Sequence, residues 1–571
     1  MADPLLTLRP RLSAAIEAAF GAEYAGTDPV LRRSDKGGDY QANAAMALGK
    51  RVGRPPREVA EAIVAAADIT DVVDAVEVAG PGFINLTLKG DFLAECVADD
   101  TAPVAEHPET VVVDYSSPNV AREMHVGHIR STVIGDSLVR VLALLGHRII
   151  RHNHLGDWGT QFGMLIEYLV DQDWERKDDH RIGDLNVLYR EANERFQSDA
   201  EFASRARARV VALQAGDAAT RAIWQDLVEE SARHFQAAYD LMGITLTPAD
   251  NVPESFYNPM LDEVAAELEA KGLARIDDGA LCAFPPGFTN RDGDPLPLIV
   301  RKSDGGYGYQ ATDLAAVRYR TMVLGATRLV YPVDARQSQH LAMVFAVSEQ
   351  AGWLGGGRRA EHVAFGTILG ADGKPFKTRS GETPKLIDLL TEAVERAAAV
   401  IAQKNPELDA GTAAEVARQV GIGAVKYADL ANDRVKDYVF DWDRMLSFDG
   451  NTAPYLQYAH ARIKSIFRRA ETDGASAGPI LVEAPAERAL ALQLVAFDEV
   501  VQATADHLQP HRLAGYLFEL AQAFTTFYEA CPVLRADTAE QRASRLALCE
   551  VTAETLSRGL ELLGIEAPDR M

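Results

Sequence analysis

Two histidines, His125 and His128, enclose Val126 and Gly127 at the end of a loop that begins at Ser116. Imidazole N–H groups donate hydrogen bonds to phosphate oxygens, and a glycine between them leaves room for a flat ring such as a purine to come close. The spacing therefore predicts a phosphate-binding loop. A pair of structural histidines on a helix cap is the alternative that the same four residues allow.

The segments on both sides of this loop favour the binding interpretation. A β-branched run from Val111 to Tyr115 predicts a buried strand, and apolar residues recur at helical spacing from Ile129 to Leu145. Gly146 ends this helix, and a second strand begins at His147. A strand–loop–helix–strand unit is the start of a doubly wound nucleotide-binding fold, which binds ligands at the carboxyl edge of its parallel sheet. The helix N-terminus at that edge favours phosphate.

With these flanks the chain resembles the class I aminoacyl-tRNA synthetases, and specifically the arginyl-tRNA synthetase family. His125-Val126-Gly127-His128 matches the class I "HIGH" signature, and the runs Ser116 to Thr132 and Asn153 to Gly163 resemble the arginine family over their whole length. The resemblance extends over essentially the full chain. It implies an arginine–tRNA ligase, which activates L-arginine with ATP to arginyl-adenylate and then loads tRNA(Arg), with Mg²⁺ accompanying the ATP phosphates.

The resemblance also implies which residues handle ATP. The second class I signature, KMSKS, is degenerate here, with its best match at Phe376 to Ser380. Family members of this kind are thought to compensate with a lysine three residues before the first signature histidine, where this chain has Arg122. We therefore expect catalysis from His125, His128, Arg122, Lys377 and Arg379, and ATP binding by His125, Gly127, His128, Asp334, Lys377 and Ser380. Without the family, Lys377 and Arg379 would be a solvated basic loop, and Asp334 equally a structural turn.

The amino-acid pocket should be acidic, because a guanidinium group needs planar, bidentate carboxylate partners. The resemblance implies that Asp313 binds the arginine side chain beside Tyr309, and that Asp114 is a second acidic pocket position. The full implied set is Asp114, Ser117, Asn119, His128, Tyr309, Asp313 and Gln337. Taken alone, Asp313 would be a helix-start cap, and Trp158 a core residue.

Two further segments are candidates for RNA contact. Aromatic residues Tyr455 and Tyr458 precede a basic helix face with Arg462 and Lys464, a combination suited to stacking bases and holding phosphates. It resembles the family's anticodon-binding domain, although the run alone would be an ordinary packed helix. Phe83 and Asn85 match the family strand that faces the tRNA D-loop. A strand-core role for Phe83 is equally open.

These segments imply an α/β multidomain fold in four parts. We expect an additional α/β N-terminal domain at 1–108, which contacts the tRNA elbow, and a Rossmann-type parallel-sheet catalytic domain at 109–385 with a helical insertion at about 171–295. A helical stem-contact region should span 386–450, and an all-α anticodon-binding domain 451–571. Later strands are predicted at Leu298 to Arg301, Arg328 to Pro332 and His362 to Leu369.

Composition limits the remaining possibilities. The net charge of -25 over 571 residues argues against indiscriminate nucleic-acid binding. None of the four cysteines forms a CxxC pair, so we expect free thiols and no zinc site. Without a signal peptide or a long apolar run, a cytoplasmic protein with no membrane partner is expected, and the family implies a monomer that needs tRNA for activation.

The alternatives are a paralogous arginyl-tRNA synthetase that serves inhibitor resistance or natural-product assembly, a noncatalytic tRNA-binding relative, and another small-molecule nucleotidyltransferase.

Overall fold

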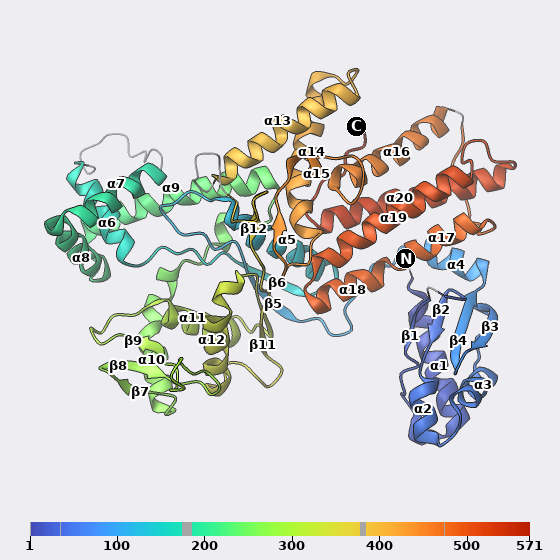
Figure 1. The fold of residues 1–571 in the computed structure, drawn as a ribbon, viewed down its shortest axis with the longest axis horizontal. Helices are drawn as coiled ribbons and strands as arrows, with labels where there is room; N and C mark the ends of the chain where they lie inside the picture. Colours follow the sequence, from blue (N-terminus) through green and yellow to red (C-terminus); the bar gives the residue numbers. More distant parts are fainter. Residues whose placement is uncertain (1, 35, 174–184, 377–383, 473) are drawn as a thin grey trace.

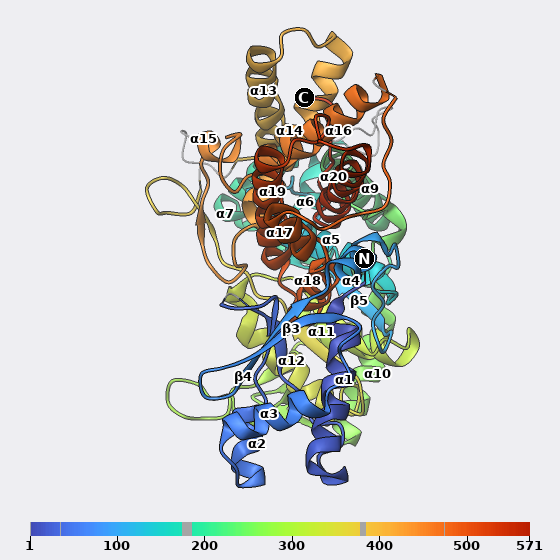
Figure 2. The same cartoon turned by 90° about the vertical axis from the view of Figure 1, so that its right-hand side faces the viewer.

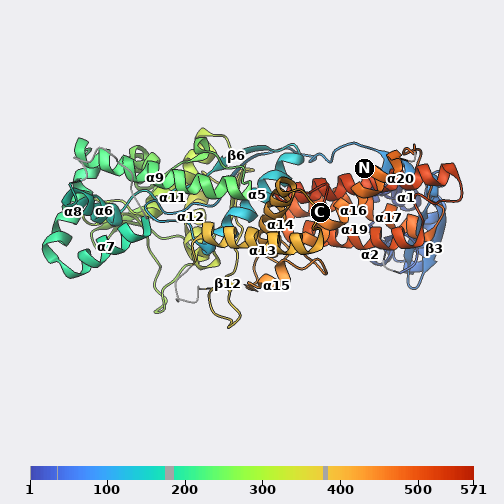
Figure 3. The same ribbon diagram turned by 90° about the horizontal axis from the view of Figure 1, so that it is seen from above.

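The computed structural model describes residues 2–34, 36–173, 185–376, 384–472 and 474–571. The molecule is elongated (Figures 1 and 3), with α6 (Thr160–Asp171), α7 (Leu185–Ser198) and α8 (Ala200–Gln214) at one end. The N-terminal unit and the last helices lie at the other end. No helix among the described residues is long and apolar enough to cross a membrane.

The N-terminal unit is an antiparallel sheet in the order β1-β2-β4-β3, with helices packed beside it (Figure 2). Its elements are α1 (Pro4–Phe20), β1 (Leu31–Arg33), β2 (Tyr40–Ala42), α2 (Ala45–Val52), α3 (Pro56–Ala66), β3 (Val73–Ala79), β4 (Phe83–Leu88) and α4 (Gly90–Ala98). Strand β4 does not alternate strictly, because Ile84, Asn85 and Leu86 are all buried. Asn85 tolerates burial because its Oδ1 accepts a hydrogen bond from Gln41 Nε2 at 2.9 Å.

A four-stranded parallel sheet forms the core, in the order β11-β10-β5-β6. Its strands are β5 (Thr110–Asp114), β6 (Arg148–His152), β10 (Arg328–Tyr331) and β11 (Arg359–His362). Helix α5 (Ile129–Leu144) connects β5 to β6. The Rossmann-type fold class predicted from the first strand, loop and helix is confirmed.

Helices cover both faces of this sheet, and alternate residues of β5 face opposite sides. Val111 and Val113 pack in the hydrophobic cluster that holds α5 and the C-terminal helices. Val112 packs in a second cluster with α11 (Tyr309–Arg318) and α12 (Ser338–Gln350). Burial on both faces explains why this strand reads as a continuous β-branched run.

The segment between β6 and β10 contains helices first and an antiparallel sheet afterwards. Helix α9 (Ala218–Met242) follows α6 to α8, and a unit then forms from short helices η4 (Pro248–Asp250) and η5 (Glu254–Met260), α10 (Leu261–Ala270), β7 (Ala274–Asp277), β8 (Ala280–Ala283) and β9 (Leu298–Arg301). The strand predicted at Leu298 to Arg301 exists, but it pairs antiparallel with β8 and lies outside the parallel sheet. No helix separates β8 from β9, and parallel pairing needs a crossover, usually a helical one.

The single strand predicted from His362 to Leu369 is wrong. Strand β11 ends at His362, and β12 (Ile368–Leu369) pairs with β13 (Tyr438–Val439) in a separate two-stranded sheet. Between them the Gly366 N–H donates to Arg434 O at 2.9 Å, so the chain is already bonded to the C-terminal part there.

The rest of the chain is helical, as its sequence predicted. Its elements are α13 (Leu386–Lys404), α14 (Ala410–Leu430), α15 (Trp442–Met445), α16 (Ala453–Thr472), α17 (Pro485–Leu494), α18 (Phe497–His507), α19 (Pro510–Ala530) and α20 (Ala539–Leu562). The N-terminal unit contacts α17: Arg488 pairs with Asp39 and donates to Leu88 O at 2.8 Å. All four cysteines are free and buried.

Candidate functional site

The two signature histidines lie at the carboxyl edge of the parallel sheet, in the turn that leads into α5. His125 caps the short helix η2 (Val126–His128). Its Nδ1 accepts the Gly127 N–H at 3.0 Å, and His128 Nδ1 accepts the His125 N–H at 3.1 Å. A nitrogen that accepts a backbone N–H carries no proton, so we assign the proton of each neutral ring to Nε2, with His128 Nδ1 also 3.3 Å from His125 O. Both rings therefore keep a hydrogen-bond donor for a ligand.

The environment keeps these imidazoles neutral. Burial lowers the pKa of His128 to about 3, and His125 and Arg122 contribute to the shift. Burial and Arg122 also lower the pKa of His125. The ring centroids are 4.1 Å apart, so a charge on one imidazole disfavours a charge on the other. The pair can thus bind phosphate oxygens as neutral donors.

Gly127 is needed by the protein itself. A Cβ atom at this position would lie 2.8 Å from His125 Cε1 and 2.9 Å from His125 Nδ1. The space that we expected a ligand ring to use is bordered by the His125 ring, so any side chain at 127 would displace that imidazole.

Asp114, the last residue of β5, is engaged within the protein. Its Oδ2 lies 2.8 Å from Nη2 of the buried Arg320, and its Oδ1 accepts the Ser117 hydroxyl at 2.9 Å. Burial raises the pKa of Asp114, but Arg320 and the nearby histidines outweigh burial, so the net pKa is lowered. Both carboxylate oxygens of Asp114 thus have a partner within the protein, and its place as a second acidic position of the arginine pocket stays a prediction.

The loop after Asp114 has an unusual backbone. Ser116 and Ser117 are both in the left-handed region, with φ of 70° and 47°, a conformation that costs non-glycine residues about 1–3 kcal/mol each. Asn153 Oδ1 accepts the Ser117 N–H at 3.0 Å and helps hold it. The exposed Asn119 follows, forming a β-bridge with Gly156. Ser117 and Asn119 thus stand on a fixed loop beside Asp114.

The first turns of α11 carry the other predicted arginine-binding residues. Tyr309 starts the helix with 59% of its surface exposed, and its ring contacts the His340 ring edge-on at 5.0 Å. Asp313 Oδ2 lies 2.6 Å from His340 Nε2. Asp313 is not a helix cap, because Gly308 holds the cap position. Gln337 is exposed at the end of η7 (Ala335–Gln337), which leads into α12.

Sequence reasoning missed two residues of this pocket. Burial raises the pKa of Glu254 to about 8, and the like charges of Asp313 and Asp157 add to the rise. His154 stacks on Tyr257 at 5.5 Å, and its buried Nδ1 has no hydrogen-bond partner among the described residues. Glu254 lies in no motif, so only folding reveals it. His154 lies inside the run that resembles the family, which could have marked it.

The basic residues predicted around the phosphates are described only in part. Lys377, Arg379 and Ser380 lie outside the described residues. Just after them, Pro384 O accepts the Val126 N–H at 3.2 Å, and the Leu386 N–H donates to Met124 O at 2.8 Å. The chain that leaves the second signature is therefore bonded to the first. Arg122 is exposed, with its guanidinium carbon 3.9 Å from the centroid of the Tyr189 ring.

Asp334 fills the structural role that the sequence left open. Its Oδ1 accepts the Arg336 N–H at 2.8 Å and caps η7. The Arg336 guanidinium pairs with both oxygens, at 2.8 and 2.7 Å. Contact with a nucleoside would require Arg336, which is exposed, to move. Trp158 is half-buried with its ring edge-on to Trp224, in agreement with a core role.

Comparison with known proteins identifies the family of this chain. Residues 93–442 match the family model described as tRNA synthetases class I (R), catalytic domain. Residues 6–88 match the arginyl tRNA synthetase N terminal domain, and residues 456–571 the DALR anticodon binding domain. An arginine–tRNA ligase of Thermobifida fusca is 55% identical, with 100% of both chains covered, and one of Proteus mirabilis is 50% identical, with 99% of both covered.

The chain belongs to the arginyl-tRNA synthetase family. Solved structures agree: the arginyl-tRNA synthetase of Plasmodium falciparum superposes with a TM-score of 0.85 at 30% identity, covering 100% of both chains. That of Thermus thermophilus gives 0.83 at 28% identity, covering 99% of this chain and 100% of its own.

In this synthetase, the predicted residues of the N-terminal unit line a basic cavity. Phe83 is half-buried at the start of β4 and borders a cavity of about 500 Å³ together with Asn85. The cavity is also lined by Arg32, Arg33 and Lys36. The Phe83 side chain is therefore not fully buried in the sheet core, and it borders a cavity lined by basic side chains.

The predicted residues of α16 separate into different environments. Tyr458 and Arg462 border a cavity of about 530 Å³ whose other basic residues are Arg468, Arg469 and Arg570. Tyr455 packs on Phe518 at 5.6 Å. Lys464 Nζ lies 3.9 Å from Asp569 and borders another cavity, with Asp99, Asp100 and Glu554. Arg558 also lines the cavity at Lys464, beside these carboxylates. RNA contact by Tyr455, Tyr458, Arg462 and Lys464 stays a prediction.

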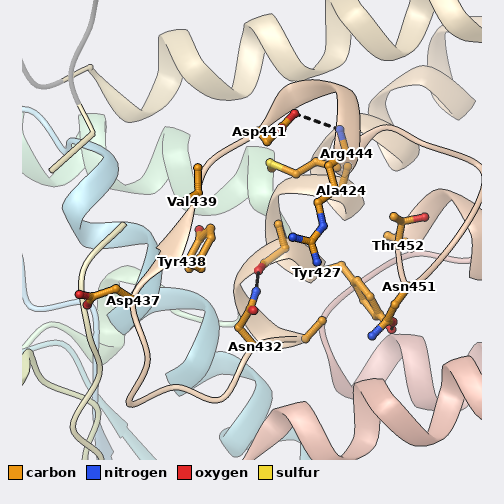
Figure 4. A pocket seen from close by; sticks show the side chains of 14 residues that line it. Ala424, Tyr427, Asn432, Asp437, Tyr438, Val439, Asp441, Arg444, Asn451 and Thr452 are labelled. Carbon is orange, nitrogen blue, oxygen red and sulfur yellow. Dashed lines mark hydrogen bonds between the residues drawn. The ribbon is translucent and has the colours of Figure 1, made fainter. Parts of the chain in front are cut away.

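A further cavity of about 290 Å³ in this synthetase lies between α14, β13, α15 and the start of α16 (Figure 4). The Arg444 side chain points into it, and Tyr427, Asn432 and Tyr438 contribute to its wall. None of its lining residues is a predicted site residue. It is separate from the signature histidines.

Proposed function

We propose that this chain is an arginine–tRNA ligase in which neutral imidazoles hold ATP and an acidic pocket holds arginine at the carboxyl edge of one parallel sheet. The observation that supports the proposal is the geometry of His125 and His128, whose Nδ1 atoms accept backbone N–H groups at the turn into α5 and so leave Nε2 as the donor of each ring. Family membership supports the activity, because the relatives named above are arginine–tRNA ligases.

We assign ATP to the signature side of the site. His125 and His128 would donate Nε2–H to the phosphates, with Gly127 keeping the turn tight. Lys377, Arg379 and Ser380 would meet the phosphates from the opposite side, and Arg122 would add its charge there. Asp334 would reach the nucleoside after releasing Arg336. Fixed donors and cations aimed at the charge that builds up in the transition state are the main source of catalysis in such a reaction.

We assign arginine to the pocket between α11 and the Asp114 loop. Asp313 and Glu254 would take the guanidinium group, since two carboxylates in one pocket can satisfy a planar fork of donors. Tyr309 and Gln337 would pack and bond beside it. Ser117, Asn119 and His128 would orient the amino-acid end, with Asp114 holding Ser117 in place.

The reaction then proceeds in two displacements. A carboxylate oxygen of arginine attacks the α-phosphorus of ATP, the bond to the bridging oxygen breaks, and pyrophosphate leaves with the electron pair. A ribose hydroxyl of the terminal adenosine of tRNA(Arg) next attacks the arginyl carbonyl, forming the ester and releasing AMP and a proton. The protein mainly positions the reactants.

Mg²⁺ would arrive with ATP. Among the residues that the structure describes, no group of three or more His, Cys, Asp or Glu side chains could hold a metal ion. Phosphate oxygens and water would supply most of its ligands, because Mg²⁺ usually keeps several waters when it binds with substrate phosphates.

We propose two contact areas for tRNA. The basic cavity at Phe83 and Asn85 would receive the D-loop at the tRNA elbow, and the cavity at Tyr458 and Arg462 the anticodon. Stacking on aromatic rings beside arginines suits unpaired bases. The parts 1–108, 109–385, 386–450 and 451–571 would then serve elbow, catalysis, stem and anticodon. We propose a cytoplasmic monomer, active in general protein synthesis.

Pyrophosphate exchange tests the proposal. Full-length protein is assayed with arginine, lysine or no amino acid, each with and without tRNA(Arg). We expect exchange with arginine and tRNA only. Equal rates with lysine would contradict the arginine pocket, full exchange without tRNA would contradict tRNA-dependent activation, and no exchange at all would support the noncatalytic relative. That relative is not favoured, because the signature histidines and Asp313 are intact.

A further inference from the structure

One buried cation lies beneath the arginine pocket. Arg320 is 1% exposed, and its guanidinium group reaches the carboxyl ends of three neighbouring strands. Nη2 lies 2.8 Å from Asp114 Oδ2, and Nε donates to His152 Nδ1 at 3.2 Å. The guanidinium carbon is 5.3 Å from the centroid of the Tyr331 ring. Asp114, His152 and Tyr331 are the last residues of β5, β6 and β10.

A π-helical turn places this side chain. Helix α11 ends at Arg318, and Tyr319–Val323 form a π-helix. Arg318 pairs with Glu263 and Glu267 of α10, whereas Arg320, two residues later, faces the sheet. Turns of this kind occur mostly as single interruptions of α-helices, frequently at functional sites.

Arg320 connects the two walls of the pocket. The π-helical turn that carries Arg320 continues directly from α11, which carries Tyr309 and Asp313. Its partner Asp114 accepts the Ser117 hydroxyl and so holds the loop whose backbone is left-handed at Ser116 and Ser117. The ion pair therefore joins the helix that receives the substrate side chain to the loop that receives its amino-acid end.

The chemistry of the pair also bears on the substrate. Asp114 is a buried carboxylate at the edge of a site for arginine, and an unpaired one would attract any guanidinium group. Arg320 supplies that guanidinium from within the protein. His152 accepts from Arg320 and so is neutral, and burial and Arg320 lower the pKa of His152 to about 3. The base of the site is thus balanced in charge without substrate.

We propose that Arg320 is a positioning residue for arginine activation, which occupies Asp114 and fixes α11 against the Ser117 loop so that substrate arginine binds in one orientation. The inference rests on the proposed function. It predicts that loss of Arg320 impairs the use of arginine and leaves the binding of ATP intact, because the signature histidines are held by other contacts.

The test compares Arg320→Ala with Arg318→Ala, a matched control that removes an arginine from the same helix end but away from the pocket. KM for arginine and for ATP is measured by pyrophosphate exchange with tRNA(Arg). Arg320→Ala should raise KM for arginine about tenfold or more, with KM for ATP near wild type. Its melting temperature should fall, because Asp114 is left buried and unpaired, and a cooperative melting transition shows that the variant is folded. Arg318→Ala should change neither KM. An unchanged KM for arginine in folded Arg320→Ala, or an equal rise in both, would overturn the proposal.

Guanidinium ion provides a second readout, because it can replace the group that Arg320→Ala removes. At low millimolar concentration it should restore part of the arginine-dependent exchange of Arg320→Ala by binding at Asp114, whereas it should only inhibit wild type. If Arg320→Ala does not fold, the double variant Asp114→Asn/Arg320→Met removes both charges together, which avoids an unpaired buried ion. A wild-type KM for arginine in that double variant would refute the proposal. Absence of exchange in wild type itself would instead refute the proposed function.

Discussion

The guanidinium carbon of Arg122 lies 3.9 Å from the centroid of the Tyr189 ring on α7. This contact is a cation–π interaction between the signature loop and the helical insertion. The same guanidinium lowers the pKa of His125 and contributes to the low pKa of His128. The charge of Arg122 is therefore felt at the signature histidines. Its guanidinium group lies over the Tyr189 ring, which the compact ammonium group of a lysine would contact differently.

Arg122→Ala should lower the rate of pyrophosphate exchange by about a hundredfold, the effect of removing one preorganised donor from a transition state. Arg190→Ala is the control, because Arg190 is exposed on the same helix as Tyr189. Tyr189→Leu should cause a smaller loss. A wild-type rate for Arg122→Ala would show that Arg122 does not compensate for the degenerate second signature.

Asp313→Asn should raise KM for arginine by about a hundredfold, since removing one partner of a buried charged pair costs about 3–5 kcal/mol and partial exposure of Asp313 reduces this. The measurement is the arginine dependence of exchange at saturating ATP and tRNA. Asp277→Asn, on the exposed edge of β7, serves as the control. If KM for arginine stayed within twofold, Asp313 would not bind the side chain.

Arginine binding should strengthen as pH rises through about 8, the pKa of Glu254 in the free protein. Below that pH Glu254 binds a proton, and the incoming guanidinium must displace it. Calorimetry in buffers of different ionisation enthalpy should detect proton release at about pH 7, and Glu254→Gln should abolish it. Proton release that persists in Glu254→Gln would assign the titration to another group.

The raised pKa of Glu254 also affects the stability of the folded protein, and the direction of the pKa shift determines whether stability rises or falls with pH. A carboxyl group whose pKa is raised on folding holds a proton that the unfolded chain has lost, so Glu254 disfavours the folded state increasingly between pH 4.5, its ordinary pKa, and about 8. Denaturant unfolding of Glu254→Gln at high pH should therefore show greater stability than wild type.

Phe83→Ala should raise KM for tRNA about tenfold, because stacking of a base on an aromatic ring contributes about 1–3 kcal/mol. KM for arginine should not change. Ile276→Ala is the control, since Ile276 is an exposed apolar residue of β7, on another sheet. If KM for tRNA did not change, Phe83 would have only a structural role in the sheet core, which is the alternative that the sequence left open.

Local pattern was sufficient for much of the molecule. The β-branched run of β5, the helical spacing of α5 and the four residues His125 to His128 between them identify the parallel sheet and its ligand-binding edge. These features depend on neighbours in sequence, where side-chain periodicity and backbone preference act directly. For the same reason the helical C-terminal part could be predicted from its composition and spacing.

Only the tertiary structure decided which charges are paired. The sequence marked Asp114 as a pocket residue, whereas its ion pair with Arg320 follows from the fold. Glu254 lies in no motif, and its pKa is raised by burial and by the charge of Asp313. Strand β9 was visible in the sequence, whereas its place outside the parallel sheet was not. Ion pairs and strand partners join residues far apart in the chain, so they follow from topology and burial, which no local pattern encodes.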